Sequence, residues 1–139
     1  MKYMLDTNIC IYAMKNKPKT VAQAMHKNLS QGFCISTITL AELLHGVEKS
    51  VNVEKNKITL ESFLDIVDIF LFDTKAAEEY GKICAYLQRQ GTPIGIMDML
   101  IAAHALSQNL TLVTNNVREF ERVPNLQIEN WSEENETAI

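Results

Sequence analysis

Short, continuously apolar segments alternate along this chain with longer stretches in which apolar residues recur every three or four positions. The first pattern is typical of strands buried on both faces, and the second of amphipathic helices. The strand-like segments lie at residues 3–5, 33–35, 69–72 and 110–114, and an edge strand is expected at 126–129. Because strands and helices alternate, the order predicts an α/β fold with a mostly parallel sheet of four or five strands.

The intervening stretches predict helices, several of which begin or end at typical capping residues. They are expected from Asn8, from Val21 and from Thr39, over residues 53–67, between Asp73 and Gly91, over 96–108, and in a short turn through Phe120. His45 and His104 fall among apolar neighbours on two of these helices, which favours packing or surface roles over catalysis.

The size and apolar content predict one globular domain over residues 1–131, followed by an acidic, frayed tail over 132–139. No apolar run reaches the roughly 18 residues needed to span a membrane, and no signal-peptide pattern opens the chain. We therefore expect a cytoplasmic protein without membrane contact. Three isolated cysteines, an odd number, predict free thiols rather than a disulfide or zinc framework.

The net charge of −4 is divided unevenly along the chain. Residues 1–60 carry a net charge of +4, and residues 61–139 carry one of −8. The basic half includes a cluster of lysines at positions 15, 17, 19 and 27. These lysines either meet the phosphates of a nucleic acid or only keep a helix–loop–helix surface in solution. The acidic total therefore does not exclude a nucleic-acid substrate.

Polar residues follow three of the predicted strands. Asp6 ends the first, residues 37–42 follow the second, and residues 114–116 end the fourth. Parallel α/β sheets bind their ligands at the carboxyl ends of the strands. The sequence therefore predicts that these polar groups emerge at one edge of the sheet.

Three carboxylates, the first two of them in these regions, each admit a structural and a chemical interpretation. Asp6 could cap the helix expected from Asn8, although Thr7 and Asn8 are themselves good caps. Glu42 stands three residues after Thr39, as in a capping box. Asp98 lies in an early helical turn that is otherwise almost wholly apolar, where a gain of roughly 0.3–1 kcal/mol from the helix dipole does not explain a carboxylate. A metal ion or a buried partner explains Asp98 better.

Carboxylates gathered at one edge repel one another unless a cation neutralises them. A site of oxygen ligands without a His or Cys cluster favours Mg²⁺, with Mn²⁺ as a substitute, over zinc. Such a site suits phosphodiester hydrolysis, since the metal stabilises charge on the phosphate and activates a water. We expect Asp6 and Asp98 to hold the metal and Glu42 to accept the proton of the water.

Four segments of the chain resemble, in order and separation, the motifs of PIN-domain VapC toxins. They are Met4-Leu5-Asp6-Thr7-Asn8, Thr39-Leu40-Ala41-Glu42-Leu43-Leu44-His45-Gly46, Pro93-Ile94-Gly95 with Asp98-Met99-Leu100-Ile101-Ala102, and Val113-Thr114-Asn115-Asn116-Val117-Arg118-Glu119-Phe120. The resemblance runs from about residue 2 to Trp131. It implies a PIN-like three-layer α/β/α sandwich in which Asp6, Glu42 and Asp98 match the first three acidic positions.

The same resemblance implies a function and its partners. It implies a toxic, Mg²⁺-dependent endoribonuclease of a toxin–antitoxin system, a hydrolase that inhibits translation. A VapB-type antitoxin would hold it inactive, the toxin would be a homodimer, and operator DNA would be contacted only through the antitoxin complex.

The fourth acidic position departs from the family pattern, because Asn116 stands where many PIN domains have an aspartate. Either the Asn116 carbonyl oxygen or the carboxylate of Glu119 completes the site. The hydroxyl and amide groups of Thr7, Thr114, Asn115 and Asn116 are expected to bind phosphate or orient water.

The expected substrate is a structured RNA cut in an exposed loop, since sequence-specific readers of RNA mostly target unpaired bases. The resemblance favours the anticodon region of a tRNA, with ribosomal RNA as the alternative. A DNA-directed flap nuclease is disfavoured, since those enzymes usually need arches and extra helices. A catalytically silent PIN binding module remains the alternative from another class, and Asp6, Glu42 and Asp98 argue against it.

Overall fold

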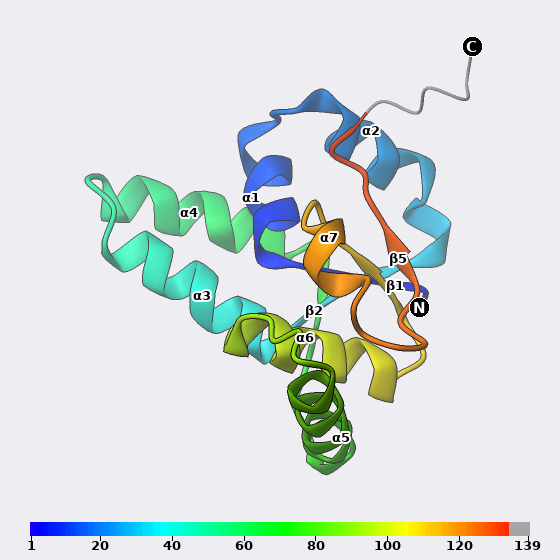
Figure 1. Cartoon of the computed structure of the whole chain (residues 1–139). Coiled ribbons are helices and arrows are strands. Elements are labelled where there is room, and N and C mark those ends of the chain that lie inside the picture. The colour runs from blue at the N-terminus through cyan, green and yellow to red at the C-terminus, as the bar shows by residue number, and fades with distance from the viewer. Residues whose placement is uncertain (134–139) are drawn as a thin grey trace.

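The computed structural model describes residues 1–133, which form a five-stranded sheet with helices on both faces (Figure 1). The strands are β1 (Tyr3–Leu5), β2 (Phe33–Ser36), β3 (Asp68–Phe70), β4 (Thr111–Val113) and β5 (Ile128–Glu129). Their order in the sheet is β3-β2-β1-β4-β5, and every pairing is parallel. The predicted parallel α/β sheet is confirmed, with five strands.

Seven α-helices and one 3₁₀ turn are described in residues 1–133. They are α1 (Thr7–Lys15), α2 (Lys19–Lys27), η1 (Leu29–Gln31), α3 (Thr37–Glu48), α4 (Val53–Leu64), α5 (Thr74–Gln90), α6 (Ile96–Ser107) and α7 (Val117–Phe120). None of the described helices is both long and apolar enough to cross a membrane.

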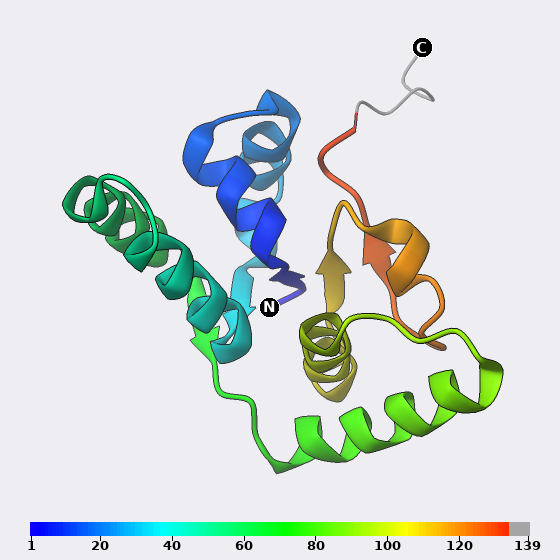
Figure 2. The ribbon, with the colours of Figure 1, turned by 60° about the vertical axis from the view of Figure 1, so that its left-hand side comes forward.

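The sheet separates two hydrophobic cores, because successive side chains of a strand point to opposite faces. Tyr3 and Leu5 of β1 pack on one face with apolar residues of α1, α2, α3 and α4. Met4, between them, packs on the other face with residues of α5, α6 and α7. Figure 2 shows α6 nearly end-on beside the sheet and α5 running across outside it. The three-layer arrangement expected from the resemblance is confirmed.

The helices expected from near Asn8 and from Thr39 begin slightly earlier, at Thr7 and at Thr37. α1 begins at Thr7, since the carboxylate of Asp6 accepts a hydrogen bond from the Ile9 amide at 3.0 Å. α3 begins at Thr37, since the hydroxyl of Ser36 accepts one from the amide of Ile38. A side-chain acceptor before the first turn satisfies amides that have no partner within the helix.

Other boundaries agree with the sequence or shift by a few residues. Asp73 caps α5, and Gly91 ends it in the left-handed conformation, both as predicted. The edge strand β3 stops at Phe70 rather than at residue 72, and Leu71 beyond it is 75% exposed. α4 stops at Leu64, before the predicted residue 67, because the chain turns there into β3.

The cysteines are free thiols, as predicted, with Cys10 and Cys34 buried and Cys84 half-buried. The acidic tail was predicted from Ser132, and its residues 134–139 lie outside the described residues.

Candidate active site at the carboxyl edge of the sheet

A cavity of about 150 Å³ lies at the carboxyl ends of the central strands. The residues that line it come from the β1–α1 junction, α3, α6 and the segment after β4, and they are Asp6, Thr7, Asn8, Glu42, Asp98, Ile101 and Asn116. The three carboxylates predicted to converge therefore line one cavity. Segments more than 90 residues apart in the sequence meet there because β1 lies between β2 and β4 in the sheet.

Asp6 is held rigidly at the end of β1. Its backbone amide donates to the carbonyl of Val113 in β4, which continues the β1–β4 ladder by one residue. One carboxylate oxygen caps α1, and the other accepts a hydrogen bond from the Thr114 hydroxyl at 2.5 Å. The side chain is 6% exposed, and burial raises its pKa, an effect to which the charge of Glu42 adds. Asp6 is therefore both the cap of α1 and a member of the cavity.

Glu42 lies in the second turn of α3, so the predicted capping box with Thr39 is wrong. The cap of α3 is Ser36, and the Glu42 carboxylate accepts a hydrogen bond from the Thr7 hydroxyl at 2.5 Å instead. This contact joins α3 to the first residue of α1. It turns the carboxylate toward Asp6 at the edge of the sheet.

Asp98 stands in the first turn of α6, as predicted. Its pKa is raised to about 6, first by burial, then by a hydrogen bond with Glu119 and the charge of that residue, and then by the charges of Asp6 and Glu42. Burial and like charges both disfavour the ionised form of a carboxyl group. The pKa of Asp98 therefore depends on the charges of the other acids of the site.

Both candidates for the fourth position contact Asp98. The side-chain amide of Asn116 lies 3.4 Å from the Asp98 carboxylate and lines the cavity. Glu119, one turn later, lies close enough to raise the pKa of Asp98 but is not among the residues that line the cavity. The sequence left these two residues as alternatives, and the fold brings both to the same carboxyl group.

The polar residues around the three acids differ in whether their side chains line the cavity. Thr114 is fully buried, and its hydroxyl also accepts a hydrogen bond from the Asn116 amide. The side-chain amide of Asn115 donates to the hydroxyl of Tyr12 at 3.0 Å, away from the cavity. Among the residues expected to contact phosphate or water, Thr7 and Asn116 line the cavity, while Thr114 and Asn115 do not.

A link between α3 and α6 is not evident from the sequence. His104 is fully buried, and its Nδ1 atom lies 2.8 Å from the hydroxyl of Ser36, the cap of α3. Burial lowers the pKa of His104, which favours the neutral ring. α3 carries Glu42 and α6 carries Asp98, so this pair joins the two helices that supply those carboxylates. A serine before the predicted helix was the only local signal of it.

The donor set of the cavity suits a hard divalent cation. It offers three carboxylates and two side-chain amides, and no lysine or arginine is among its lining residues. In the described part of the chain, no three Asp, Glu, His or Cys side chains lie close enough together to make a complete metal site. Mg²⁺ is usually held by one or two carboxylates and keeps several waters. A cation held directly by two of the carboxylates therefore fits the cavity.

Comparison with known proteins reveals near full-length relatives. Residues 3–126 match the family model of the PIN domain. The chain is 48% identical over 131 residues to the tRNA(fMet)-specific endonuclease VapC of Salmonella typhimurium, covering 94% of this chain and 98% of that protein. It is 50% identical over 133 residues to the protein of the same name from Shigella flexneri, with 95% and 99% of the two chains covered.

A solved structure agrees with these matches. The crystal structure of VapBC2 from Rickettsia felis, bound to a DNA fragment from their promoter, superposes with a TM-score of 0.90. The two chains are 43% identical, and the match covers 94% of this chain and 99% of that one. Sequence, fold and relatives agree, and the chain therefore belongs to the PIN-domain family and, within it, to the VapC ribonucleases.

Proposed function

We propose that this chain cleaves RNA internally by hydrolysis, using a divalent cation, Mg²⁺ or Mn²⁺, held in the carboxylate cavity. The observation that carries the proposal is the convergence of Asp6, Glu42 and Asp98 on one cavity with no basic side chain in its lining. Neutralising such a cluster requires a cation, and an RNA phosphate brings only further negative charge. A catalytically silent binding module would have no need for this concentration of acid.

Asp6 and Asp98 are the residues that would hold the cation. When bound, the cation supplies charge stabilisation for the phosphate and acidifies a water. Asp6 is oriented for this task by the hydrogen bonds from Ile9 and Thr114, which leave its carboxylate little freedom to turn. We assign Thr114 the positioning of Asp6, since a fully buried hydroxyl cannot reach the substrate.

Glu42 is the proposed general base. The Thr7 hydroxyl donates to Oε1 of Glu42 and orients the carboxylate, which leaves Oε2 to accept a proton from the attacking water. Asn116 lies at the rim beside Asp98 and can donate to a phosphate oxygen, while Glu119 adds negative charge next to the same carboxyl group. The site is therefore three acids with two supporting residues, one neutral and one charged.

The proposed substrate is initiator tRNA, cut in its anticodon region. The relatives from Salmonella typhimurium and Shigella flexneri are both named tRNA(fMet)-specific endonucleases, and each is close to half identical to this chain over nearly its whole length. An anticodon loop offers unpaired bases, which proteins read more readily than a double-stranded RNA helix. Cleavage there would remove the tRNA that starts translation.

The proposed partner is a VapB-type antitoxin that holds the enzyme inactive. The similar complex from Rickettsia felis is a VapBC assembly bound to promoter DNA. We propose the same arrangement for this chain, with operator DNA contacted through the antitoxin complex and the toxin present as a homodimer.

The test uses purified, antitoxin-free protein and transcripts of initiator and elongator tRNA. The initiator transcript should be cut with Mg²⁺ or Mn²⁺, and cleavage should stop with EDTA. Asp98→Asn should lose activity by a factor of at least about 100, in line with the size of metal and charge effects on catalysis. Asp65→Asn, the same change at an exposed residue that does not line the cavity, is the matched control. RNA cleavage that persists in both EDTA and Asp98→Asn would overturn the proposal.

A further inference from the structure

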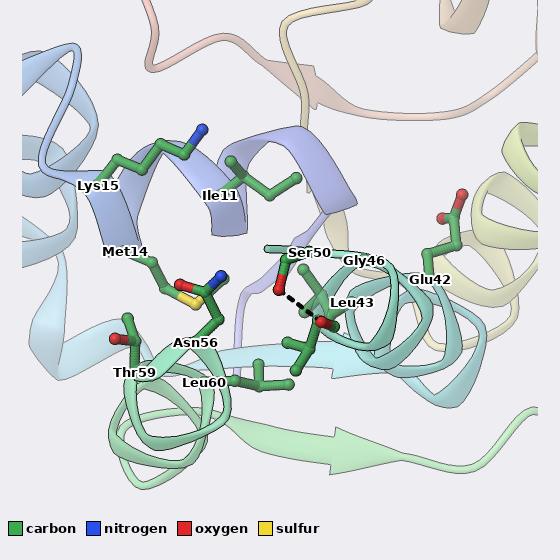
Figure 3. Close-up of a pocket in the computed structure, with 11 residues that line it drawn as sticks. Ile11, Met14, Lys15, Glu42, Leu43, Gly46, Ser50, Asn56, Thr59 and Leu60 are labelled. Carbon is green, nitrogen blue, oxygen red and sulfur yellow. Dashed lines mark hydrogen bonds between the residues drawn. The ribbon is translucent and has the colours of Figure 1, made fainter. Parts of the chain in front are cut away.

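A second, larger pocket of about 290 Å³ adjoins the carboxylate cavity, between α1, α3 and α4 (Figure 3). We call it the α1–α3–α4 pocket. Glu42 lines both this pocket and the carboxylate cavity, so the two spaces share one side chain. Figure 3 shows Glu42 at one end of the pocket, with its carboxylate directed away from the apolar side chains. An occupant of the α1–α3–α4 pocket therefore lies next to the residue that we propose as the general base.

The walls of this pocket are apolar and its rim is polar. Ile11, Met14, Leu43, Val47 and Leu60 supply the apolar surface. Ser50, Asn56 and Thr59 add hydroxyl and amide groups from α4 and the turn before it. Figure 3 shows Asn56 and Thr59 on the side of the space opposite α1, and Ser50 beside α3 with its hydroxyl donating to the backbone of that helix. The Thr59 hydroxyl likewise donates to the carbonyl of Lys55.

Lys15 adds a positive charge at the end of α1, on the same pocket. The only ion pair among the described residues joins Lys82 and Glu79, so Lys15 is available to an anion. It belongs to the half of the chain that carries a net charge of +4. A phosphate of a strand leaving the carboxylate cavity over α1 would meet this lysine.

Resting on the proposed ribonuclease function, we propose that the α1–α3–α4 pocket binds one unpaired nucleobase of the RNA, next to the phosphodiester that is cut. A nucleobase has apolar faces that suit Met14 and Leu60, and polar edges that suit Asn56 and Thr59. Ligand pockets measure roughly 300–1,000 Å³, so a pocket just below the lower end of that range suits a single ring system. Lys15 would hold the phosphate attached to that nucleotide.

Continuity with the proposed catalytic cavity favours a nucleotide as the occupant. In a single strand, the base next to the cut must lie within one nucleotide of the reacting phosphate. A pocket that shares Glu42 with the cavity meets this requirement. RNA readers that act on loops commonly splay out single bases and bind them in this way.

Gly46 offers a way to fill this pocket without disturbing the helix. It lines the pocket from α3, and a Cβ atom added there meets nothing within 4 Å. Gly46→Leu therefore places a side chain in the pocket at a site with room for it, and leucine favours a helix more than glycine does. Gly81→Leu on α5 is the matched control, since a Cβ there also meets nothing within 4 Å.

The experiment compares the wild type, Gly46→Leu and Gly81→Leu on synthetic anticodon arms of initiator tRNA. One arm is intact, and in each of the others a single nucleotide around the cut lacks its base. The measured quantity is kcat/KM with Mg²⁺. Circular dichroism and thermal unfolding check that both variants fold, with Tm values no lower than that of the wild type.

For the wild type, removing the base at one position should lower kcat/KM by roughly 5- to 150-fold, the range expected for the loss of one base contact. Gly46→Leu should lower it by a similar factor on the intact arm and show no further loss on that abasic arm. Equal rates of the wild type and Gly46→Leu on the abasic arm show that Glu42 still functions. Gly81→Leu should match the wild type on every arm.

Gly46→Leu cutting the intact arm as fast as the wild type overturns the proposal. The proposal is also overturned if Gly46→Leu lowers kcat/KM by the same factor on the intact arm and on every abasic arm. If Gly46→Leu cleaves normally but no longer binds a VapB-type antitoxin, the occupant is a protein segment and the nucleobase assignment is wrong. Failure of the wild type and Gly81→Leu to cut any arm would instead contradict the proposed function itself.

Discussion

The hydroxyl of Thr114 donates to the carboxylate of Asp6 at 2.5 Å, across the pair of neighbouring strands β4 and β1. Both residues directly follow their strands, and both are buried. The register of the sheet therefore determines where Asp6 points. A buried carboxylate held in this way has little freedom to turn, which suits the role in holding a cation that we propose for Asp6.

Thr114→Val keeps the shape of the side chain and removes this hydrogen bond. Leaving the buried Asp6 oxygen without its partner should lower the free energy of unfolding by about 1–3 kcal/mol. It should also raise the metal concentration needed for half-maximal RNA cleavage, because Asp6 loses its orientation. Thr114→Ser, which keeps the hydroxyl, should stay near the wild type in both measurements. If Thr114→Val needs the same metal concentration as the wild type, Thr114 does not position Asp6 for the metal.

The raised pKa of Asp98 predicts an unusual dependence of stability on pH in the metal-free protein. Its pKa in the folded state is about 6, against 3.8 for the ordinary carboxyl group. The folded protein thus binds this proton more tightly than the unfolded chain, so stability from this group is present below pH 3.8 and lost as the pH rises through about 6. At pH 7 in EDTA, Asp98→Asn should melt at a higher temperature than the wild type. An equal or lower Tm would contradict the crowding of charge at Asp98.

The fourth acidic position can be tested by changing the charge of its two candidates, Asn116 and Glu119, one at a time. Asn116→Asp restores the acid common in the family and should lower the Mn²⁺ concentration at half-maximal cleavage. Glu119→Gln removes the acid that raises the pKa of Asp98 most after burial, and should raise that concentration several-fold. Glu121→Gln, at an exposed position just after α7, is the control. If Glu119→Gln and the control behave alike, Glu119 takes no part in the site.

The lowered pKa of His104 predicts that the protein loses stability in acid. Burial lowers its pKa from 6.5, so the unfolded chain takes up this proton at a higher pH than the folded protein. The corresponding stability is present above pH 6.5 and is lost as the pH falls below it. His104→Leu should show a smaller loss between pH 7 and pH 5 than the wild type. Chemical unfolding at a series of pH values measures this, and parallel curves for the two proteins would contradict it.

Ser36 can be tested separately from His104. Ser36→Ala removes the cap of α3 and the contact with His104, and should cost about 0.5–2 kcal/mol of stability. Ser36→Thr, which keeps a hydroxyl, should lose less. A reduced kcat for Ser36→Ala on RNA, measured where it is fully folded, would show that the cap also positions the helix that carries Glu42.

The sequence predicted the sheet and the meeting of its polar ends because both follow from periodicity and chain order. Asp6, which directly follows β1, lies at the predicted edge of the sheet for this reason. The start of α3 was missed because Ser36, Thr37 and Thr39 are all good caps, and local sequence does not rank them. The Ser36–His104 contact spans 68 residues, and no local pattern reports it. The direction of Asn115, toward Tyr12, likewise depends on tertiary packing.

The central claim is that Asp6 and Asp98 hold a divalent cation beside Glu42, and that this site cleaves RNA. The most direct test is a titration of metal-free protein with Mn²⁺, in which bound metal is followed by electron paramagnetic resonance and initiator tRNA cleavage is measured in the same samples. Binding and cleavage should rise together in the wild type and be lost together in Asp98→Asn. Cleavage that proceeds at the full rate before Mn²⁺ is bound, or that survives in Asp98→Asn, would contradict the claim.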